Sequence, residues 1–436
     1  MTPTRSLGLL AALALLMACE SEVILEGERL DLRALDAEQE IAAPVGRAEP
    51  IQLPAMSDNA EWTHRNGSGA DQSRHPALAS ELTRVWSSDI GQGEGRRHRI
   101  STEPVVAGGR VFTMDSRALV SATSTSGERL WQRDLTPSYA GPNDASGGGL
   151  AHGAGRLFVA SAFGTLTAID PATGEVHWTQ RFDAPVSGAP AVRGGHVYVV
   201  SNEGAAYAVD VENGRLRWRV PGVPSAASMS GGAAPAVTDR AVLFPFPSGD
   251  LVSALRDDGI ETWRRRIAGS RGGQAYAQVR DITGDPVVVG STVYVGNQSG
   301  RVMALDLDSG DPRWSAEEAA YGPVWPVAGS VFVNNDRGEL LRLDAQNGER
   351  IWNVELPYYT REREGRRAEI FAHYGPVLAG GRLIMASNDG LMRGFDPESG
   401  ALIEQVEVPR GATARPVVAG RTLFVVSTDG RLHAYR

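Results

Sequence analysis

Cysteine and lysine-rich segments are nearly absent from this chain of 436 residues. Cys19 is the only cysteine, so no intrachain disulfide and no cysteine-based metal site can form. The histidines include no short-spaced pair of the metal-binding kind. A formal charge of −9 without any lysine-rich patch argues against nucleic acid as a partner. We therefore predict no metal site and no nucleic-acid-binding function.

Long hydrophobic runs are also missing. The apolar stretch Leu7–Met17 is too short to span a bilayer, which takes about 20 residues. It ends in Leu16-Met17-Ala18-Cys19, which resembles the lipobox of bacterial lipoproteins. The resemblance implies that residues 1–18 are a signal peptide and that the Cys19 thiol is acylated; an ordinary signal peptide is the alternative. Glu20, in place of aspartate, implies by the same resemblance a lipid anchor in the outer membrane, on its periplasmic face.

What the sequence has instead is a regular repeat of glycine and tryptophan. A glycine is followed four residues later by tryptophan six times, at Gly127/Trp131, Gly174/Trp178, Gly214/Trp218, Gly259/Trp263, Gly310/Trp314 and Gly348/Trp352. A seventh copy has Gly400 but carries Glu404 in the tryptophan position. Because tryptophan is rare, this spacing indicates one structural unit repeated along the chain.

Each unit carries further marks. A second glycine lies ten residues before the paired one, as at Gly164, and an aspartate usually lies four residues before it, as at Asp170. Short β-rich runs such as Val197-Tyr198-Val199 alternate with turns such as Ser248-Gly249 that accept positive φ. The pattern predicts four short antiparallel strands per unit, with tryptophan on the outer strand. We expect the rings to fill the wedges between adjacent sheets, namely Trp86, Trp131, Trp178, Trp218, Trp263, Trp314 and Trp352.

Counting the units predicts the architecture. Seven complete copies run from about Pro104 to about Val408, and an eighth begins at Pro416 but ends at Arg436, before its tryptophan position. The strand 82–86 carries the missing ring, Trp86. We therefore predict an all-β fold, an eight-bladed β-propeller over residues 61–436, whose N- and C-terminal strands close the ring in one composite blade. An open solenoid is the alternative, but it would not need split ends.

The segment before the propeller carries none of these marks. Residues 19–60 contain Glu, Ala and Pro without the repeat. We predict a lipidated tether here, with a short helix over Glu28–Ile41.

The blade pattern, from about residue 80 to the end, resembles the quinoprotein-type repeat of dehydrogenases that use pyrroloquinoline quinone (PQQ). That resemblance implies a quinone and a metal ion in the central funnel, held by Glu, Asn and Asp, beneath an adjacent Cys–Cys disulfide. The mature chain has no cysteine for such a disulfide, and no acidic set matches the cofactor ligands. We therefore predict no cofactor and no catalytic residue, and keep a periplasmic PQQ-dependent dehydrogenase as an alternative.

Two long blade-to-blade links flank the blade of Trp263, over residues 221–234 and 266–285. Every hairpin reverses the chain, so both links lie on the same face and must be neighbours. The first holds Val223, Ala227 and Met229, and the second holds Tyr276, Val279, Arg280, Asp281 and Ile282. Apolar side chains beside a charge in exposed loops predict a protein-docking patch. The alternative is that these residues plug the mouth of the propeller.

Lipobox, tether, eight quinoprotein-like blades and missing cofactor ligands together resemble the BamB family, lipoproteins of the outer-membrane β-barrel assembly (BAM) machinery. The resemblance is strongest in Ala234-Pro235, Asp281-Ile282 and Gly300–Leu305. It implies a scaffold without catalytic activity that binds the periplasmic POTRA domains of BamA, with other BAM subunits and unfolded outer-membrane protein clients as further partners. A propeller lipoprotein that binds cell-wall or carbohydrate ligands is a third alternative.

The same resemblance implies which residues touch BamA. The family's first link has a Leu-x-Leu-Arg-Gly segment, whose counterparts here are Ala227, Met229, Ser230 and Gly231. The second link has Asp-x-Asp, matched by Asp281 and Thr283. Met229 keeps the apolar contact and Asp281 the first carboxylate, whereas Ser230 replaces the arginine. The expected partner-binding residues are therefore Ala227, Met229, Ser230, Asp281 and Thr283.

Overall fold

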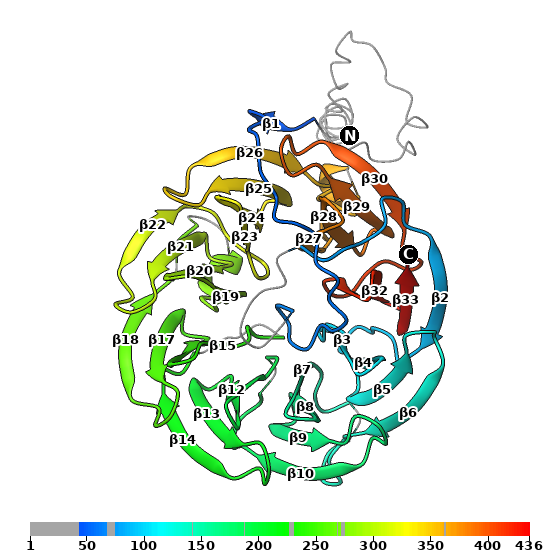
Figure 1. Ribbon diagram of the computed structural model, residues 1–436, viewed down its shortest axis with the longest axis vertical. Helices are drawn as coiled ribbons and strands as arrows, with labels where there is room; N and C mark the ends of the chain where they lie inside the picture. The colour runs from blue at the N-terminus through cyan, green and yellow to red at the C-terminus, as the bar shows by residue number, and fades with distance from the viewer. Residues whose placement is uncertain are drawn as a thin grey trace, which may run out of the picture. The chain divides into compact units, whose positions relative to one another are not determined.

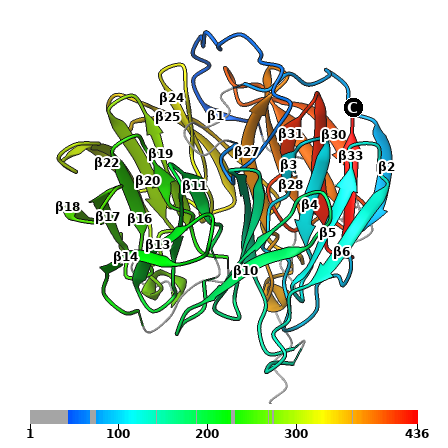
Figure 2. The same ribbon diagram turned by 60° about the horizontal axis from the view of Figure 1, so that its bottom comes forward.

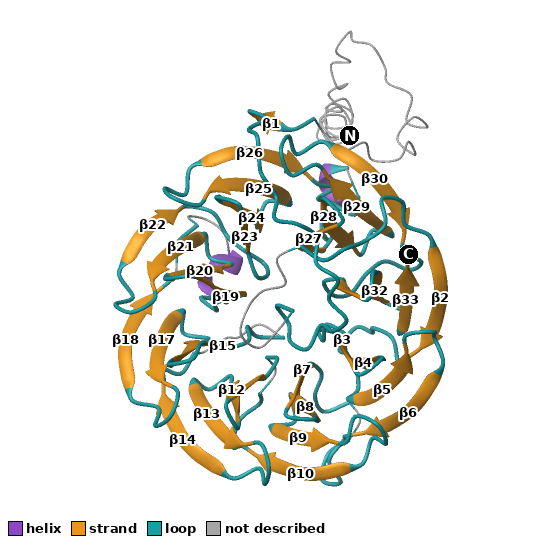
Figure 3. Cartoon of the chain, viewed as in Figure 1, coloured by secondary structure: helices purple, strands orange, loops and turns teal. Residues whose placement is uncertain are grey.

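Strands provide nearly all of the regular structure, and they form eight separate sheets around one axis (Figure 1). The computed structural model describes residues 43–67, 75–141, 143–186, 188–225, 231–267, 269–271, 275–361 and 363–436. Within these ranges the helices are two short 3-10 turns, η2 (Ala275–Gln278) and η3 (Glu364–Arg366) (Figure 3). The described residues contain no helix with the length and hydrophobicity to cross a membrane. The predicted signal peptide, Cys19 and the helix over Glu28–Ile41 lie outside them.

Seven blades consist of consecutive antiparallel strands, with the first at the axis and the fourth at the rim. The first three blades are β3 (Val105–Ala107), β4 (Arg110–Met114), β5 (Leu119–Ser124), β6 (Arg129–Asp134); β7 (Gly148–Gly153), β8 (Arg156–Ser161), β9 (Thr165–Ile169), β10 (Val176–Arg181); and β11 (Ala191–Arg193), β12 (His196–Val200), β13 (Ala205–Asp210), β14 (Leu216–Pro221). The fourth and fifth are β15 (Ala236–Val237), β16 (Ala241–Pro245), β17 (Asp250–Leu255), β18 (Glu261–Arg266); and β19 (Gly284–Val289), β20 (Thr292–Asn297), β21 (Arg301–Asp306), β22 (Pro312–Ala316). The sixth and seventh are β23 (Trp325–Val327), β24 (Ser330–Asn334), β25 (Glu339–Asp344), β26 (Arg350–Glu355); and β27 (His373–Ala379), β28 (Arg382–Ser387), β29 (Leu391–Phe395), β30 (Leu402–Glu407).

The eighth blade joins the two ends of the chain. The C-terminal part supplies β31 (Val417–Ala419), β32 (Thr422–Ser427) and β33 (Arg431–Tyr435), and β2 (Arg84–Asp89) is the outer strand. Trp86 pairs with Ala434, so it occupies the outer-strand position that tryptophan takes in other blades. The predicted all-β, eight-bladed propeller with a composite closing blade is confirmed.

The repeated aspartate closes the turn between the third and fourth strands of a blade. Asp170 Oδ1 accepts hydrogen bonds from the backbone N–H groups of Ala172 and Thr173, both at 2.8 Å. The side chain thereby supplies an acceptor for turn N–H groups that have no strand partner. The paired glycine of the same turn, Gly174, has a φ of +73°, which glycine adopts without steric cost. Equivalent bonds occur at Asp210, Asp306, Asp344 and Asp396.

The paired glycine also receives the tryptophan ring of the preceding blade. A Cβ atom on Gly348 would lie 2.5 Å from Cε3 of Trp314, whose indole N–H donates to Ala345 O at 2.9 Å in the same turn. Glycine and tryptophan of one repeat therefore do not contact each other; each meets its partner from a neighbouring unit. The same contact is made by all seven rings, Trp86, Trp131, Trp178, Trp218, Trp263, Trp314 and Trp352.

Glu404 replaces tryptophan in the seventh blade because the eighth blade has no turn between its third and outer strands. A ring on β30 would have no glycine to meet. Glu404 instead accepts a hydrogen bond from Leu82 N at 2.9 Å and pairs with Arg382 at 2.6 Å. Arg382 in turn donates to Ala79 O at 2.8 Å. The carboxylate thus holds the chain that enters β2, at the place where other blades insert an indole.

Residues 43–67 and 75–83, here called the strap, wrap the propeller before β2 begins. The strap starts as β1 (Val45–Gly46), a fifth strand on the outer edge of β26. It then crosses one face of the disc (Figure 2), where Trp62 N donates to Val106 O and Gly420 N donates to Asn59 O. This face carries the turns between first and second strands, and we call it the turn face. Residues 43–60, assigned to the tether from sequence, therefore lie on the propeller.

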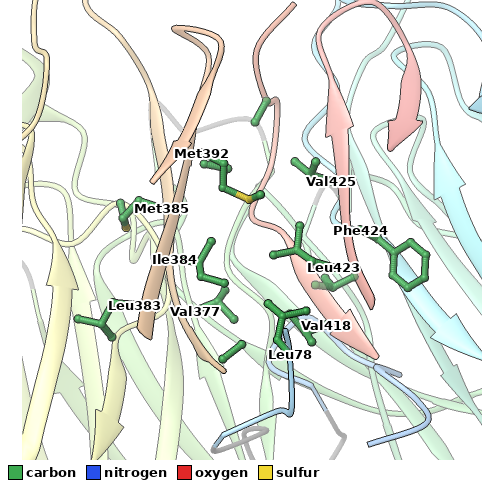
Figure 4. Close-up of a cluster of buried hydrophobic side chains, with 14 of the residues drawn as sticks. Leu78, Val377, Leu383, Ile384, Met385, Met392, Val418, Leu423, Phe424 and Val425 are labelled. Carbon is green, nitrogen blue, oxygen red and sulfur yellow. The ribbon is translucent and has the colours of Figure 1, made fainter. Parts of the chain in front are cut away.

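The strap is also part of the hydrophobic core. Trp62 is completely buried. Leu78 lies among Val377 of β27 and Val418 of β31, between the seventh and eighth blades (Figure 4). Since each fully buried side chain of this size contributes about 1.5–3 kcal/mol, the strap stabilises the closure of the ring.

Candidate partner-binding face

The face opposite the turn face carries the blade-to-blade links, and we call it the link face. The link from β14 to β15 is residues 222–235, here the first link, and the link from β18 to β19 is residues 267–283, the second link. A cavity of about 20 Å³ is lined by Gly232 and Ala233 of the first link and by Asp281 and Ile282 of the second. Its volume accommodates about one water molecule. The two links are therefore neighbours beside the fourth blade, as the strand topology requires.

The structure describes two of the five expected partner-binding residues. Asp281 is 4% exposed, and Ile282 beside it is 2% exposed. Thr283 is half-buried, and its hydroxyl donates to Ala320 O at 2.5 Å. Asp281 is therefore buried and the Thr283 hydroxyl is bonded to the propeller, and the binding role of both residues stays a prediction. Ala227, Met229 and Ser230 lie outside the described residues.

The side chains that the two links do expose are different ones. Val223 of the first link is 50% exposed. Arg280 of the second link is exposed as well. Val223 and Arg280 were named from the sequence as members of the two links. No motif marked them as the residues that would be exposed.

The second link lies across the fifth blade and reaches the sixth. Gly269 N donates to Ser299 Oγ at 3.0 Å. Arg271 makes two bonds to the buried carboxylate of Asp336, at 3.0 and 2.9 Å. A bidentate pair of this kind fixes both position and orientation. The second link is therefore fixed to the fifth blade through Gly269 and to the sixth blade through Arg271.

Charged side chains from the strap and from three blades meet near the axis of the propeller. Arg65 of the strap lies 3.1 Å from Glu103 and 3.4 Å from Asp285. Arg415, which precedes β31, lies 3.0 Å from the same Glu103. The side chains of Asp285 and Arg415 are 1% and 2% exposed, so this network is shielded from solvent. No sequence signal pointed to Arg65, because it lies in a segment without the repeat.

The protonation states of the axis network follow from burial and pairing. Burial alone would lower the pKa of Arg65, but Asp285 and Glu103 outweigh burial and raise it. Burial raises the pKa of Asp285, against the opposing effect of Arg65. The Arg65 guanidinium therefore stays charged, and its charge is stabilised in the buried site by Asp285 and Glu103.

The axis network also holds the first link. Arg65 Nη1 donates to Gly232 O at 2.9 Å, and Asp285 Oδ1 accepts from Ala234 N at 2.9 Å. Because Gly232 and Ala234 end the first link, its C-terminal part is fixed to the core of the molecule. Within the described part of the chain, no group of three or more His, Cys, Asp or Glu side chains is arranged to hold a metal ion.

The fold and its link face define a β-propeller of the PQQ-like repeat class. BamB from Moraxella catarrhalis superposes with a TM-score of 0.68 and 21% identity, covering 82% of this chain and 100% of that one. Quinohemoprotein alcohol dehydrogenase from Comamonas testosteroni superposes with a TM-score of 0.66 and 15% identity, covering 87% of this chain and 81% of that one. At these identities the likeness shows the shared fold.

Sequence comparison shows to which family of PQQ-like propellers the chain belongs. The family model described as "Outer membrane protein assembly factor BamB" matches residues 116–354. BamB of Yersinia pestis is 25% identical over 359 residues, which cover 81% of this chain and 88% of that protein. The chain belongs to the BamB family, which confirms the resemblance found in the sequence.

Proposed function

We propose that this protein is a non-catalytic scaffold lipoprotein of the BAM complex that binds BamA and aids the insertion of β-barrel proteins. Family membership supports a role in outer-membrane protein assembly. The predicted lipobox supports acylation at Cys19 and attachment to the periplasmic face of the outer membrane. Other BAM subunits and unfolded outer-membrane proteins are further proposed partners.

The observation that carries the proposal is the construction of the first link. Residues 222–235 contain no Asp, Glu, Lys or Arg. Arg65 and Asp285 hold the end of this link from below. An uncharged loop on a rigid support exposes apolar side chains such as Val223 at little entropic cost, which favours protein docking. We propose that Val223 and Met229 contact a POTRA domain, and that Asp281 and Thr283 support the second link beside them.

The test is co-purification of BamA from membranes with the full-length lipoprotein. A Val223→Asp, Met229→Asp double variant places two charges on the first link, and we expect at least about a tenfold loss of BamA, as for central interface residues. Ile260→Asp is the matched control, because Ile260 is 59% exposed but lies in a turn on the turn face. Undiminished BamA with a folded double variant would refute the site. Asp281 is unsuitable for this test because it is buried.

The similarity to quinohemoprotein alcohol dehydrogenase makes a PQQ-dependent dehydrogenase the second candidate. In those enzymes, by resemblance, the funnel holds the quinone. Here the ion pairs of Arg65 lie between the inner strands, and the cavity lined by Arg65 and Glu103 measures about 10 Å³. That cavity accommodates about one water molecule. Incubation with PQQ and Ca²⁺ followed by a dye-reduction assay separates the two functions, and substrate-dependent dye reduction would favour the dehydrogenase.

A further inference from the structure

Four arginines lie on a folded arm of the link face, residues 358–371, between the sixth and seventh blades. Its two sides are joined by the Tyr359–Ile370 bridge and by a hydrogen bond from Phe371 N to Tyr358 O at 2.8 Å. The guanidinium of Arg367 lies over the Tyr359 ring, 4.8 Å from its centre. The exposed arginines of this arm are Arg361, Arg363, Arg366 and Arg367. They therefore extend from an ordered element.

A second arginine-rich loop connects the eighth and first blades. Gly95 N donates to His98 O at 2.8 Å, which closes a turn. Arg96 and Arg97 are exposed at the tip of this turn. Glu94 accepts from Arg99 Nη1 at 2.9 Å and from Ile100 N at 3.2 Å, so the loop is fixed at its base.

Short contacts connect the loop and the arm into one surface. Glu94 N donates to Thr428 O at 2.7 Å, and Thr428 Oγ1 donates to Arg410 O at 2.6 Å. Asn388 N donates to Ala372 O at 3.1 Å at the base of the arm. The exposed arginines of this surface form what we call the arginine crescent: Arg96, Arg97, Arg99, Arg337, Arg361, Arg363, Arg366, Arg367 and Arg410.

The arginine crescent is positive on a chain whose net charge is −9. The carboxylates of the same loops and turns are fewer than its arginines: Glu94, Asp336, Glu362, Glu364, Glu369, Asp389 and Asp429. All 43 basic residues of the chain are arginine, and none is lysine. The planar guanidinium binds phosphate through two parallel hydrogen bonds. The chemistry therefore matches phosphate groups presented on a surface.

The strap begins beside the arginine crescent. β1 runs antiparallel to β26, with Val45 opposite Asn353 and Gly46 opposite Trp352. Because β26 ends at Glu355 on the link face, Ala43 and Pro44, which precede β1, lie toward that side. The arm begins three residues after Glu355. The first described residues of the strap therefore lie toward the link face, which also carries the crescent.

We propose that the arginine crescent binds the anionic phospholipid headgroups of the membrane that carries the lipid anchor. This inference rests on the proposed lipidation at Cys19. The acyl chains and the crescent then act on one membrane, and the first link occupies the uncharged sector of the same face for its protein partner. A few arginines at an anionic surface strengthen attachment because each adds to the attraction.

The test uses the chain from Glu20 onward, which keeps every described residue, including the compact unit 41–436, but cannot be acylated. Binding is measured by co-sedimentation with vesicles of phosphatidylcholine alone and of phosphatidylcholine with phosphatidylglycerol, at low and high NaCl. We expect binding only to the anionic vesicles, and loss of that binding at high salt. An Arg361→Gln, Arg363→Gln, Arg366→Gln variant should bind roughly 100-fold more weakly at low salt, since three surface arginines are removed.

The matched control is Arg129→Gln, Arg215→Gln, Arg240→Gln, which removes three exposed arginines near the turn face and should bind as the unmodified chain does. Equal losses in the two triple variants, or no binding to anionic vesicles, would overturn the proposal. So would an arm variant that keeps vesicle binding but loses an acidic protein partner. The vesicle assay contains no BamA, and BamA co-purification needs no vesicle, so the two proposals fail separately.

Discussion

Replacing Gly348 with alanine tests why the glycine of each repeat is required. Its φ is +76°, and a Cβ atom there would lie 2.5 Å from Trp314 Cε3. Gly329, in the same blade, has a φ of +75° and no atom within 4 Å of its Cβ position. Both substitutions carry the same left-handed backbone cost, about 1–2 kcal/mol. Only Gly348→Ala also forces a methyl group into an indole ring.

The structure sets the size of the additional cost. Overpacking against a well-packed ring costs about 1–3 kcal/mol. If the ring moves, the 2.9 Å hydrogen bond from Trp314 to Ala345 O is lost as well, which costs about 0.5–1.5 kcal/mol. We therefore expect Gly348→Ala to lower the free energy of unfolding by about 2–6 kcal/mol, against about 1–2 kcal/mol for Gly329→Ala.

Urea unfolding followed by far-UV circular dichroism provides the measurement. A third variant, Gly348→Ala with Trp314→Leu, removes the ring that the methyl group meets. The double variant should lose less unfolding free energy than Gly348→Ala and Trp314→Leu lose in total when each is measured alone, because neighbouring sites are coupled. Equal unfolding midpoints for Gly348→Ala and Gly329→Ala would refute the argument, since the indole contact would then have no energetic consequence.

Two further predictions concern the closure of the ring and the strap. Glu404→Ala leaves Arg382, whose side chain is 3% exposed, without its carboxylate partner, so we expect the free energy of unfolding to fall by about 3–5 kcal/mol. Glu404→Gln keeps an acceptor for Leu82 N and should lower the free energy of unfolding less in the same urea assay. Equal decreases for the two variants would contradict a role for the charge. Acid should weaken the strap at His64, because burial lowers its pKa from 6.5 to about 4. The folded state then binds fewer protons than the unfolded state between these values, so this stabilisation is complete above pH 6.5 and falls by about 3 kcal/mol toward pH 4. His64→Asn should flatten the dependence of the unfolding midpoint on pH, and an unchanged dependence would count against this assignment.

The sequence was sufficient to predict the blades because the repeat records a contact that every blade makes. Trp86 could be assigned to the eighth blade from spacing alone, and β2 pairs with β33 as expected. The aspartate and glycine positions follow from one turn geometry, so they recur wherever that turn does. The repeat did not show which tryptophan each glycine contacts. Contact with the ring of its own unit and contact with the ring of the preceding unit would both recur with the same period.

The path of the strap and the burial of Asp281 in the second link could not be predicted from the sequence, for the opposite reason. The strap has no periodicity, and its position depends on turns far away in the chain, such as the bond from Gly420 N to Asn59 O. Asp281 was expected at a partner-binding surface but is 4% exposed, because the second link turns back onto the fifth and sixth blades. A single sequence does not show such a fold-back, since it rests on pairs such as Arg271 with Asp336.

The strap connects the two parts of the link face that carry our proposals. It begins as β1 beside the arginine crescent, crosses the turn face, and returns through the axis as Arg65. There Arg65 holds the carbonyl of Gly232 in the first link. A force applied at Val45 is therefore opposed first by β1 and then by the buried strap, before it can reach Arg65. Because these contacts belong to one propeller core, the position of the first link relative to β1 is set by the fold.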